Sequence, residues 1–234
     1  MIFAYFEKAA KENTEGVGKL QKGDAERAFH SLVKALSTLK KLRHLHTESQ
    51  SPALANIQHN RCFKIINVPY LEDKGFFIYA NALVFSTDLG KTSNGDSSRF
   101  SLADTLTLCE AIVLFNVALL YHQRGKHCGQ DRALLGALDL YEQSQAILLG
   151  INAGYPEEVC MLKIAAMNNR IHILNEIANY PGAQEQVNEL LLQSVNALAA
   201  NNSGKGLSFL TKTDVDNFLL NALIIRRFNT APCA

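Results

Sequence analysis

Helix-forming segments that come in pairs, each pair joined by a short turn, restrict the fold of this chain more than any other feature. Apolar and small residues recur with helical spacing from Phe3 to Lys22. A second run follows a Gly23-Asp24 turn, and Asp24 is placed to cap it. Because an amphipathic helix buries its apolar stripe against a neighbour, we expect a helical hairpin over residues 1–48.

Two more pairs follow, over residues 102–149 and 156–200, and a final helix is expected over residues 213–228. In the second pair, Gly125 is expected to end the first helix, with a turn lengthened by the residues from Lys126 to Arg132. In the third pair, Pro181-Gly182 is expected to turn the chain. The chain is therefore expected to be mainly α-helical and to form one domain over residues 1–234.

Between the first two pairs the composition changes to that of β-strands. β-Branched and aromatic residues dominate Cys62–Pro69 and Phe76–Ser86, with Tyr70–Gly75 between them. This pattern predicts a β-hairpin inserted at about residues 61–87. The composition turns polar over residues 47–60, which ends the helix near Ser51-Pro52 and predicts a loop after it. Residues 90–99 are rich in turn-forming residues, and we expect an exposed loop there.

Each helical pair has roughly the length of a tetratricopeptide repeat (TPR) unit, which spans about 34 residues. Small residues stand where the helices of such a unit approach each other, at Gly16 and Ala28 in the first pair and at Ala137 in the second. The third pair keeps Ala183 but has Ile171 where a small residue would ease the approach. The pattern predicts TPR-like helical hairpins stacked into an α-α superhelix, with the β-hairpin as an insertion.

Four further segments are distinctive: Phe76-Phe-Ile-Tyr-Ala-Asn, Leu114-Phe-Asn-Val-Ala-Leu, Met167-Asn-Asn and Asp216-Asn-Phe-Leu-Leu-Asn. With these segments, the chain as a whole resembles the TPR-like proteins that occur in expanded numbers in diatom genomes. The resemblance implies a helical-repeat fold without catalytic machinery over nearly the full length. It implies no common activity.

The charge balance argues against nucleic acid and membranes as partners. The chain has 23 Lys and Arg against 22 Asp and Glu, a formal net charge of +1, which provides no strong field for polyanions. The longest apolar stretch, Ala111 to Tyr121, is interrupted by Asn116 and is shorter than the roughly 20 residues that cross a bilayer. Without a secretory signal pattern, an intracellular protein of the cytoplasm or nucleus is expected. The basic stretch of the second helix is interpreted as a solvated face, and contains Lys34, Lys40, Lys41, Arg43, His44 and His46.

No motif predicts a reaction or a cofactor. Gly90-Lys91-Thr92 resembles the end of a phosphate-binding loop, but Phe85 stands where such a loop needs a glycine. His122, His127 and Cys128 offer metal ligands without an evident fourth, so no metal site is expected. The five cysteines are scattered without a CxxC pair and are expected to be free thiols. We therefore predict a protein that is not an enzyme and uses no cofactor.

Polar residues that the repeat pattern places on the inner, concave face form the candidate binding site. Asn, His and Gln side chains there can hydrogen-bond a peptide backbone or hold the end of a partner helix. Asn116 and Asn169 fall at equivalent places in two units, where they either bind a partner or bond neighbouring backbone as structural amides. The candidates are Asn13, Asn116, His122, Gln123, Asn168, Asn169, His172 and Asn175.

Apolar side chains of the β-hairpin form a second candidate surface. Two strands alone are marginally stable in water, so these side chains must pack on the helices or on another chain. If they remain exposed, they mark an interface or self-association. They are Phe63, Ile65, Phe77, Tyr79 and Phe85.

These features favour a non-enzymatic scaffold or adaptor that binds a peptide or helix of a partner protein, through the concave face or through the hairpin. The alternative is a structural subunit built permanently into a larger protein assembly, with the hairpin covered by a neighbouring chain.

Overall fold

A computed structural model describes residues 2–49, 63–67, 72–73, 76–85, 101–151, 157–177, 180–202 and 211–230. Within these ranges the chain is mainly helical, as the sequence predicts. The loops expected after residue 49 and at 90–99 lie outside the described residues, as do Gly90-Lys91-Thr92, Cys62 and Cys233.

The first helical pair consists of α1 (Ile2–Gln21) and α2 (Ala25–Ser49). Gly23 has a φ of 76°, in the left-handed region that glycine reaches without strain, and turns the chain between them. Asp24 caps α2, because its Oδ1 accepts a hydrogen bond from the N–H of Arg27 at 3.2 Å. Gly16 allows the two helices to approach closely, since a Cβ there would lie 2.7 Å from Cδ2 of Leu32.

The second pair, α3 (Leu102–Cys128) and α4 (Asp131–Leu148), differs from expectation at its turn. α3 continues through Gly125 and ends before Gly129, whose φ is 61°. The prediction that Gly125 ends the helix before a lengthened turn is therefore wrong. Gly125 serves helix packing instead, because a Cβ there would lie 2.6 Å from Cδ2 of Leu134 in α4.

The third pair comprises α5 (Glu157–Glu176) and α6 (Tyr180–Asn202), and α7 (Lys212–Thr230) follows. α6 begins at Tyr180, so Pro181 lies in its first turn, where a missing N–H breaks no helical hydrogen bond. The prediction that Pro181-Gly182 turns the chain is wrong for this reason. Thr211 and Asp214 cap the start of α7 reciprocally, each side chain accepting from the other residue's N–H, at 3.1 and 2.9 Å.

The described residues between α2 and α3 form four short strands: β1 (Phe63–Asn67), β2 (Glu72–Asp73), β3 (Phe76–Phe77) and β4 (Asn81–Phe85). β1 pairs antiparallel with β4, with Ile65 opposite Leu83. β2 and β3 form a second antiparallel pair nested between them. The segment expected as one strand from Phe76 to Ser86 is therefore divided, and residues 78–80 belong to neither β3 nor β4.

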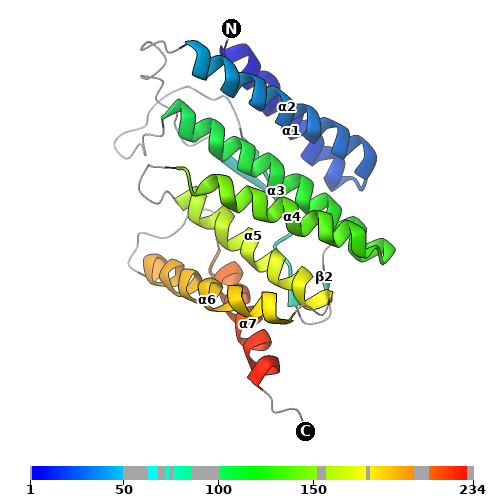
Figure 1. Ribbon diagram of the computed structural model, residues 1–234, viewed down its shortest axis with the longest axis vertical. Coiled ribbons are helices and arrows are strands. Elements are labelled where there is room, and N and C mark those ends of the chain that lie inside the picture. The colour runs from blue at the N-terminus through cyan, green and yellow to red at the C-terminus, as the bar shows by residue number, and fades with distance from the viewer. Residues whose placement is uncertain are drawn as a thin grey trace.

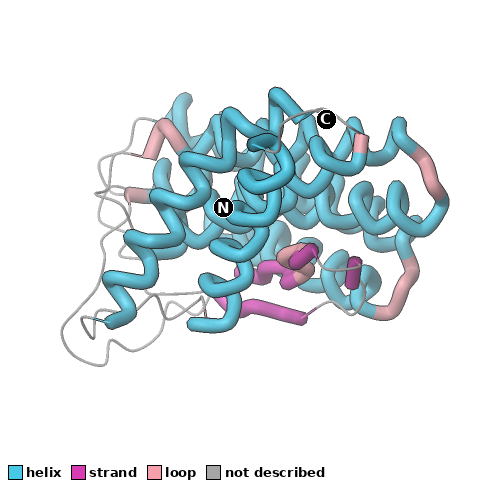
Figure 2. Tube along the Cα trace, turned by 90° about the horizontal axis from the view of Figure 1, so that it is seen from below, coloured by secondary structure: helices cyan, strands magenta, loops and turns pink. Residues whose placement is uncertain are grey.

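The helices are stacked in chain order, with α1 and α2 at one end and α6 and α7 at the other (Figure 1). α2 packs on α3, α4 packs on α5, and α6 packs on α7. The strands lie along one side of this helical layer (Figure 2), where β4 contacts both α1 and α3. Helices and β4 share one apolar core that extends from Phe6 in α1 to Ala222 in α7.

α3 is the central helix of this core. All of its residues from 108 to 120 are buried. By length and composition, α3 is the one helix in the described part of the chain that would suffice to cross a membrane, and 83% of its most apolar window is buried inside the protein. A helix that is apolar on every side is what the middle of a packed helical layer requires.

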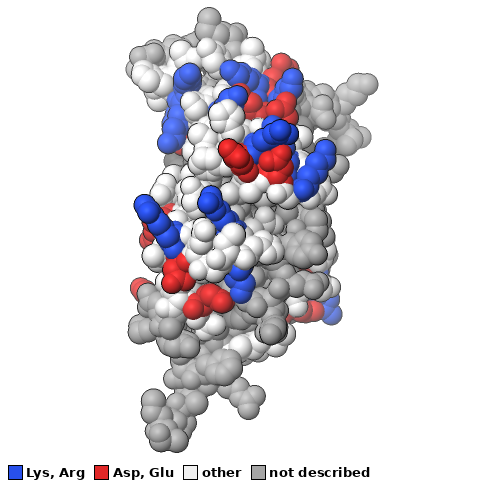
Figure 3. Space-filling view, turned by 90° about the vertical axis from the view of Figure 1, so that its right-hand side faces the viewer, with Lys and Arg blue, Asp and Glu red and all other residues white. Residues whose placement is uncertain are grey.

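Acidic and basic side chains are intermixed on the face that Figure 3 shows, without a large area of one sign. This distribution agrees with the formal net charge of +1.

Candidate functional site

Segment 78–85, which comprises β4 and the three residues before it, is the centre of the candidate site. Ile78, Tyr79 and residues 82–85 are buried, with Tyr79 fully so, and Ala80 and Asn81 are half-buried. The ring centroid of Phe85 lies 5.9 Å from that of Phe6 in α1, and the centroid of Tyr79 lies 5.8 Å from that of Phe218 in α7. Helices from both ends of the layer therefore contact this one segment.

Two asparagine side chains hold the backbone of Leu83. Asn116 of α3 binds both polar groups: its Oδ1 accepts from the Leu83 N–H at 3.0 Å, and its Nδ2 donates to the Leu83 carbonyl at 2.7 Å. Asn13 of α1 donates to the same carbonyl at 3.0 Å and accepts a hydrogen bond from Asn116 at 3.0 Å. Both asparagines are fully buried, so these bonds form away from water and are strengthened by the low local dielectric.

Asn169 of α5 repeats this arrangement at Tyr79. Its Oδ1 accepts from the Tyr79 N–H at 2.9 Å, and its Nδ2 donates to the Tyr79 carbonyl at 3.0 Å. The same Nδ2 also donates to the hydroxyl of Tyr141 in α4 at 3.0 Å. We call Asn13, Asn116 and Asn169 the asparagine clamp.

The asparagine clamp takes the place of a neighbouring strand. In an antiparallel pair, alternate residues direct their N–H and C=O groups toward the partner strand or away from it. Leu83 lies opposite Ile65 of β1 and directs both groups to Asn116, whose carboxamide carries the same donor and acceptor as a peptide group. Side chains of the helices thereby cover the edge of β4 that β1 leaves open.

A chain of buried polar side chains leads away from the clamp. The hydroxyl of Tyr141 lies 3.4 Å from Nδ1 of His122, and Nε2 of His122 lies 3.0 Å from Nδ1 of His172. Nε2 of His172 lies 3.6 Å from the carboxylate of Glu176, which also binds Lys126 at 3.3 Å.

Asn168 belongs to the same buried network. Its Nδ2 lies 3.3 Å from Oδ1 of Asn169, and its own Oδ1 accepts a hydrogen bond from Asn221 of α7 at 2.7 Å. The sequence pattern does not single out Asn221 or Tyr141 as site residues. The signal that would have found them is a polar side chain within the buried stripe of a helix.

The candidate residues that the sequence pattern predicts for a concave face therefore divide by burial and bonding. Gln123 and Asn175 are half-buried. Of the two roles open for Asn116 and Asn169, the structure gives them bonds to the chain's own backbone. The remaining candidates form two hydrogen-bonded groups on segment 78–85: Asn13 and Asn116 at Leu83, and His122, Asn168, Asn169 and His172 at Tyr79.

The hairpin candidates divide in a similar way. Tyr79 and Phe85 are buried against the helices. Phe63, Ile65 and Phe77 are placed in strands, but their side chains lie outside the described part of the structure.

The electrostatics of the site keep its hydroxyls neutral. Burial raises the pKa of Tyr141 well above the ordinary value of tyrosine, and the hydrogen bond from Asn169 offsets this only in part. Burial raises the pKa of Tyr79 in the same way. Uncharged amides and hydroxyls of this kind are suited to holding a peptide backbone.

Metal ligands and thiols are not gathered at this site. In the ranges that the structure describes, no group of three or more His, Cys, Asp or Glu side chains is placed to hold a metal ion. Cys109 is buried, Cys160 is half-buried and Cys128 is exposed.

Comparison with known proteins adds no relative: no protein-family model, no curated protein and no solved structure matches the chain.

Proposed function

We propose that the chain is a non-enzymatic, intracellular protein-protein interaction scaffold, built as a TPR-like superhelix around a resident segment of its own. The observation that carries this proposal is the asparagine clamp, which binds both backbone groups of Leu83 and of Tyr79. Bonds to backbone groups do not depend on side-chain identity, and helical arrays use them to hold polypeptide segments. Segment 78–85 takes the place that a partner peptide has in such an array.

The resident segment stays in place when a partner binds. Burying a large apolar side chain contributes about 1.5–3 kcal/mol, and Tyr79, Leu83 and Phe85 are all buried. An outside peptide would have to replace these contacts together with the bonds of the asparagine clamp. The clamp and segment 78–85 therefore serve as a rigid support, and partners bind the outward-facing sides of the helices.

Photo-crosslinking tests this proposal. A crosslinkable amino acid is introduced at exposed positions of the full chain, at Ser37 in α2 and at Asn196 in α6, and the protein is purified from cells that express it. We expect a stoichiometric protein partner crosslinked from at least one position. A chain that elutes alone as a monomer, with no crosslink from either position, would contradict the proposal.

Exposed apolar side chains on the last helices favour a second candidate function, that of a permanent subunit in a larger assembly. Leu192 of α6 is 58% exposed, and Leu220 and Leu223 of α7 are 52% and 54% exposed. The end of a stacked array is ordinarily polar, and exposed apolar side chains there indicate a covered surface. We expect Leu220→Glu with Leu223→Glu to release the chain from a stoichiometric complex on a sizing column, with an unchanged circular dichroism spectrum. A complex that persists would exclude this surface.

A further inference from the structure

The solvent-facing side of α2 combines an apolar end with a basic end. Phe29 and Val33 are 38% and 41% exposed near the start of the helix. Lys40, Lys41 and His44 are exposed farther along the same helix. A water-facing side of a helix is ordinarily polar throughout, so exposed apolar residues beside a group of cations require an explanation.

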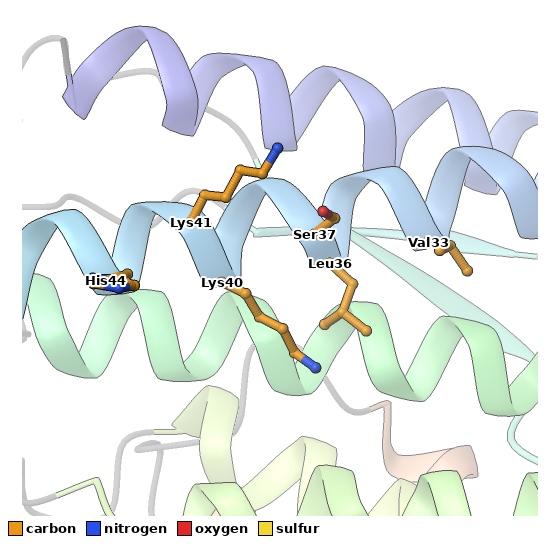
Figure 4. Close-up of a pocket in the computed structure, with 6 residues that line it drawn as sticks. All are labelled: Val33, Leu36, Ser37, Lys40, Lys41 and His44. Carbon is orange, nitrogen blue, oxygen red and sulfur yellow. The ribbon is translucent and has the colours of Figure 1, made fainter.

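The two ends meet in a depression of about 410 Å³. Leu36 and Lys40 project on the same side of α2, with Val33 at one end and His44 at the other (Figure 4). This spacing of three, four and eleven residues follows one helix face and gives a straight strip about 17 Å long. The depression is lined by Val33, Leu36, Ser37, Lys40, Lys41 and His44.

The apolar end of the strip continues onto neighbouring helices. The ring of Phe29 packs edge-on against Tyr121 of α3, with 5.9 Å between the ring centroids. Tyr121 in turn lies against α4 at Gly136, where an added Cβ would be 3.2 Å from the Tyr121 ring. Phe29 thereby continues the apolar end of α2 onto α3, and Tyr121 continues it onto α4.

The basic end carries charge that the described residues do not neutralise. α2 has no acidic residue between Glu26 and Glu48. Two of its cations are paired, Arg27 with Asp24 and Arg43 with Glu110 of α3. Lys34, Lys40 and Lys41 have no ion-pair partner within the described ranges.

We propose that Phe29, Val33, Leu36, Lys40 and Lys41, the α2 strip, bind an acidic amphipathic helix of a partner protein. Apolar side chains of such a helix cover Phe29, Val33 and Leu36, and its carboxylates pair with the two lysines. The apolar half of the strip distinguishes this partner from nucleic acid or an anionic membrane surface, because a phosphate backbone makes no use of Val33 or Leu36. The inference rests on the proposed scaffold function and names one surface for it.

The test uses a fluorescent synthetic helix of about 18 residues, long enough to cover the strip, with Leu on one face and Glu on the other. A peptide with Lys in place of each Glu is the charge-reversed comparison. We expect the Glu peptide to bind the full chain, more weakly as salt rises, and the Lys peptide not to bind. Lys40→Glu with Lys41→Glu is expected to weaken binding about tenfold or more.

Matched variants separate the strip from general charge and hydrophobicity. Lys11→Glu with Lys22→Glu makes the same change of charge at exposed positions elsewhere, and we expect less than about a twofold effect. Val33→Asp is expected to weaken binding about tenfold, whereas Val195→Asp, at a valine that is 52% exposed on α6, leaves it unchanged. Thermal melts followed by circular dichroism verify that each variant is folded. If Lys40→Glu with Lys41→Glu unfolds at a lower temperature than the unchanged chain, Lys40→Gln with Lys41→Gln is used in its place.

Three results would overturn the inference. One is a Glu peptide that does not bind, and another is binding that survives both the lysine and the Val33 substitutions. The third is binding of a single-stranded RNA, or of phosphatidylserine vesicles, that requires Lys40 and Lys41 but is unaffected by Val33→Asp. A partner crosslinked from Asn196 would still support the scaffold function in each of these cases, so the two proposals fail separately.

Discussion

The buried asparagines of the clamp satisfy polar backbone groups in the interior of the protein. An amide without a partner in a protein core costs about 1–3 kcal/mol, and the same holds for a peptide group. Asn116 and the backbone of Leu83 remove both costs at once, because each satisfies the other at 2.7 and 3.0 Å. The clamp therefore stabilises the protein by preventing two sets of unsatisfied groups.

Replacing Asn116 with leucine tests this pairing. Asn116→Leu keeps the branched shape of the side chain but leaves the N–H and C=O of Leu83 without this partner, so we expect the free energy of unfolding to fall by about 2–4 kcal/mol. Urea denaturation followed by circular dichroism measures the change. Asn196→Leu, at an exposed position of α6, is the control and is expected to change it by less than about 0.5 kcal/mol. Equal effects of the two substitutions would contradict the pairing.

Tyr141 gives the site a dependence on alkaline pH. Its pKa is raised by burial, so the native state keeps the proton while the unfolded chain loses it near pH 10. Stability is therefore unaffected below about pH 10 and falls above it, by about 1.4 kcal/mol per pH unit for this one group. Denaturation measured between about pH 9 and 11.5 should show a shallower decline for Tyr141→Phe than for the unchanged chain. Identical slopes would show that Tyr141 ionises in the folded protein.

The sequence pattern identifies the polar side chains of the asparagine clamp but not the groups to which they hydrogen-bond. Asn13, Asn116 and Asn169 stand out because they interrupt apolar helical stripes. Their partners are the backbone groups of Leu83 and Tyr79, and the bonds from Asn169 join residues 90 positions apart. Backbone groups carry no sequence signal, so the pattern leaves partner binding and structural bonding equally open.

At the scale of elements, a glycine in the sequence can indicate either of two structural roles. Glycine ends helices because it adopts positive φ, and it also allows helices to approach because it lacks Cβ. Gly125 has the second role and Gly129 the first. The choice between them depends on Leu134 of the neighbouring helix, which helical spacing alone does not place. The helices themselves follow from periodicity, so their existence is predictable while their turns are not.

Gly125→Ala measures the closeness of α3 and α4. The added methyl group would lie 2.6 Å from Cδ2 of Leu134, and we expect a loss of about 1–3 kcal/mol in the free energy of unfolding. Combining it with Leu134→Ala should cost less than the sum of the two single changes. Gly18→Ala, where an added Cβ meets nothing within 4 Å, is the control and is expected to be neutral or stabilising by up to about 1 kcal/mol. Additive effects at Gly125 and Leu134 would contradict the packing described.

At the scale of the whole molecule, segment 78–85 makes this stack of helices different from a simple helical array. In a simple array each unit contacts only its neighbours, and stability is a sum of local terms. Here one segment touches Phe6 and Asn13 of α1, Asn116 of α3, Asn169 of α5 and Phe218 of α7. Helices α1 and α7 are thereby connected through one common buried segment. We infer that this connection gives the protein the rigidity that the proposed scaffold function requires.

Amide hydrogen exchange at Tyr79 and Leu83 tests the central claim most directly. Both N–H groups are buried and bonded to asparagine side chains, at 2.9 and 3.0 Å, so we predict that they exchange only when the protein unfolds globally, as slowly as amides in the middle of α3. Asn196 in the exposed face of α6 is expected to exchange faster. Exchange at Tyr79 and Leu83 as fast as in an unstructured peptide would contradict the account, because it would mean that segment 78–85 leaves the asparagine clamp in solution.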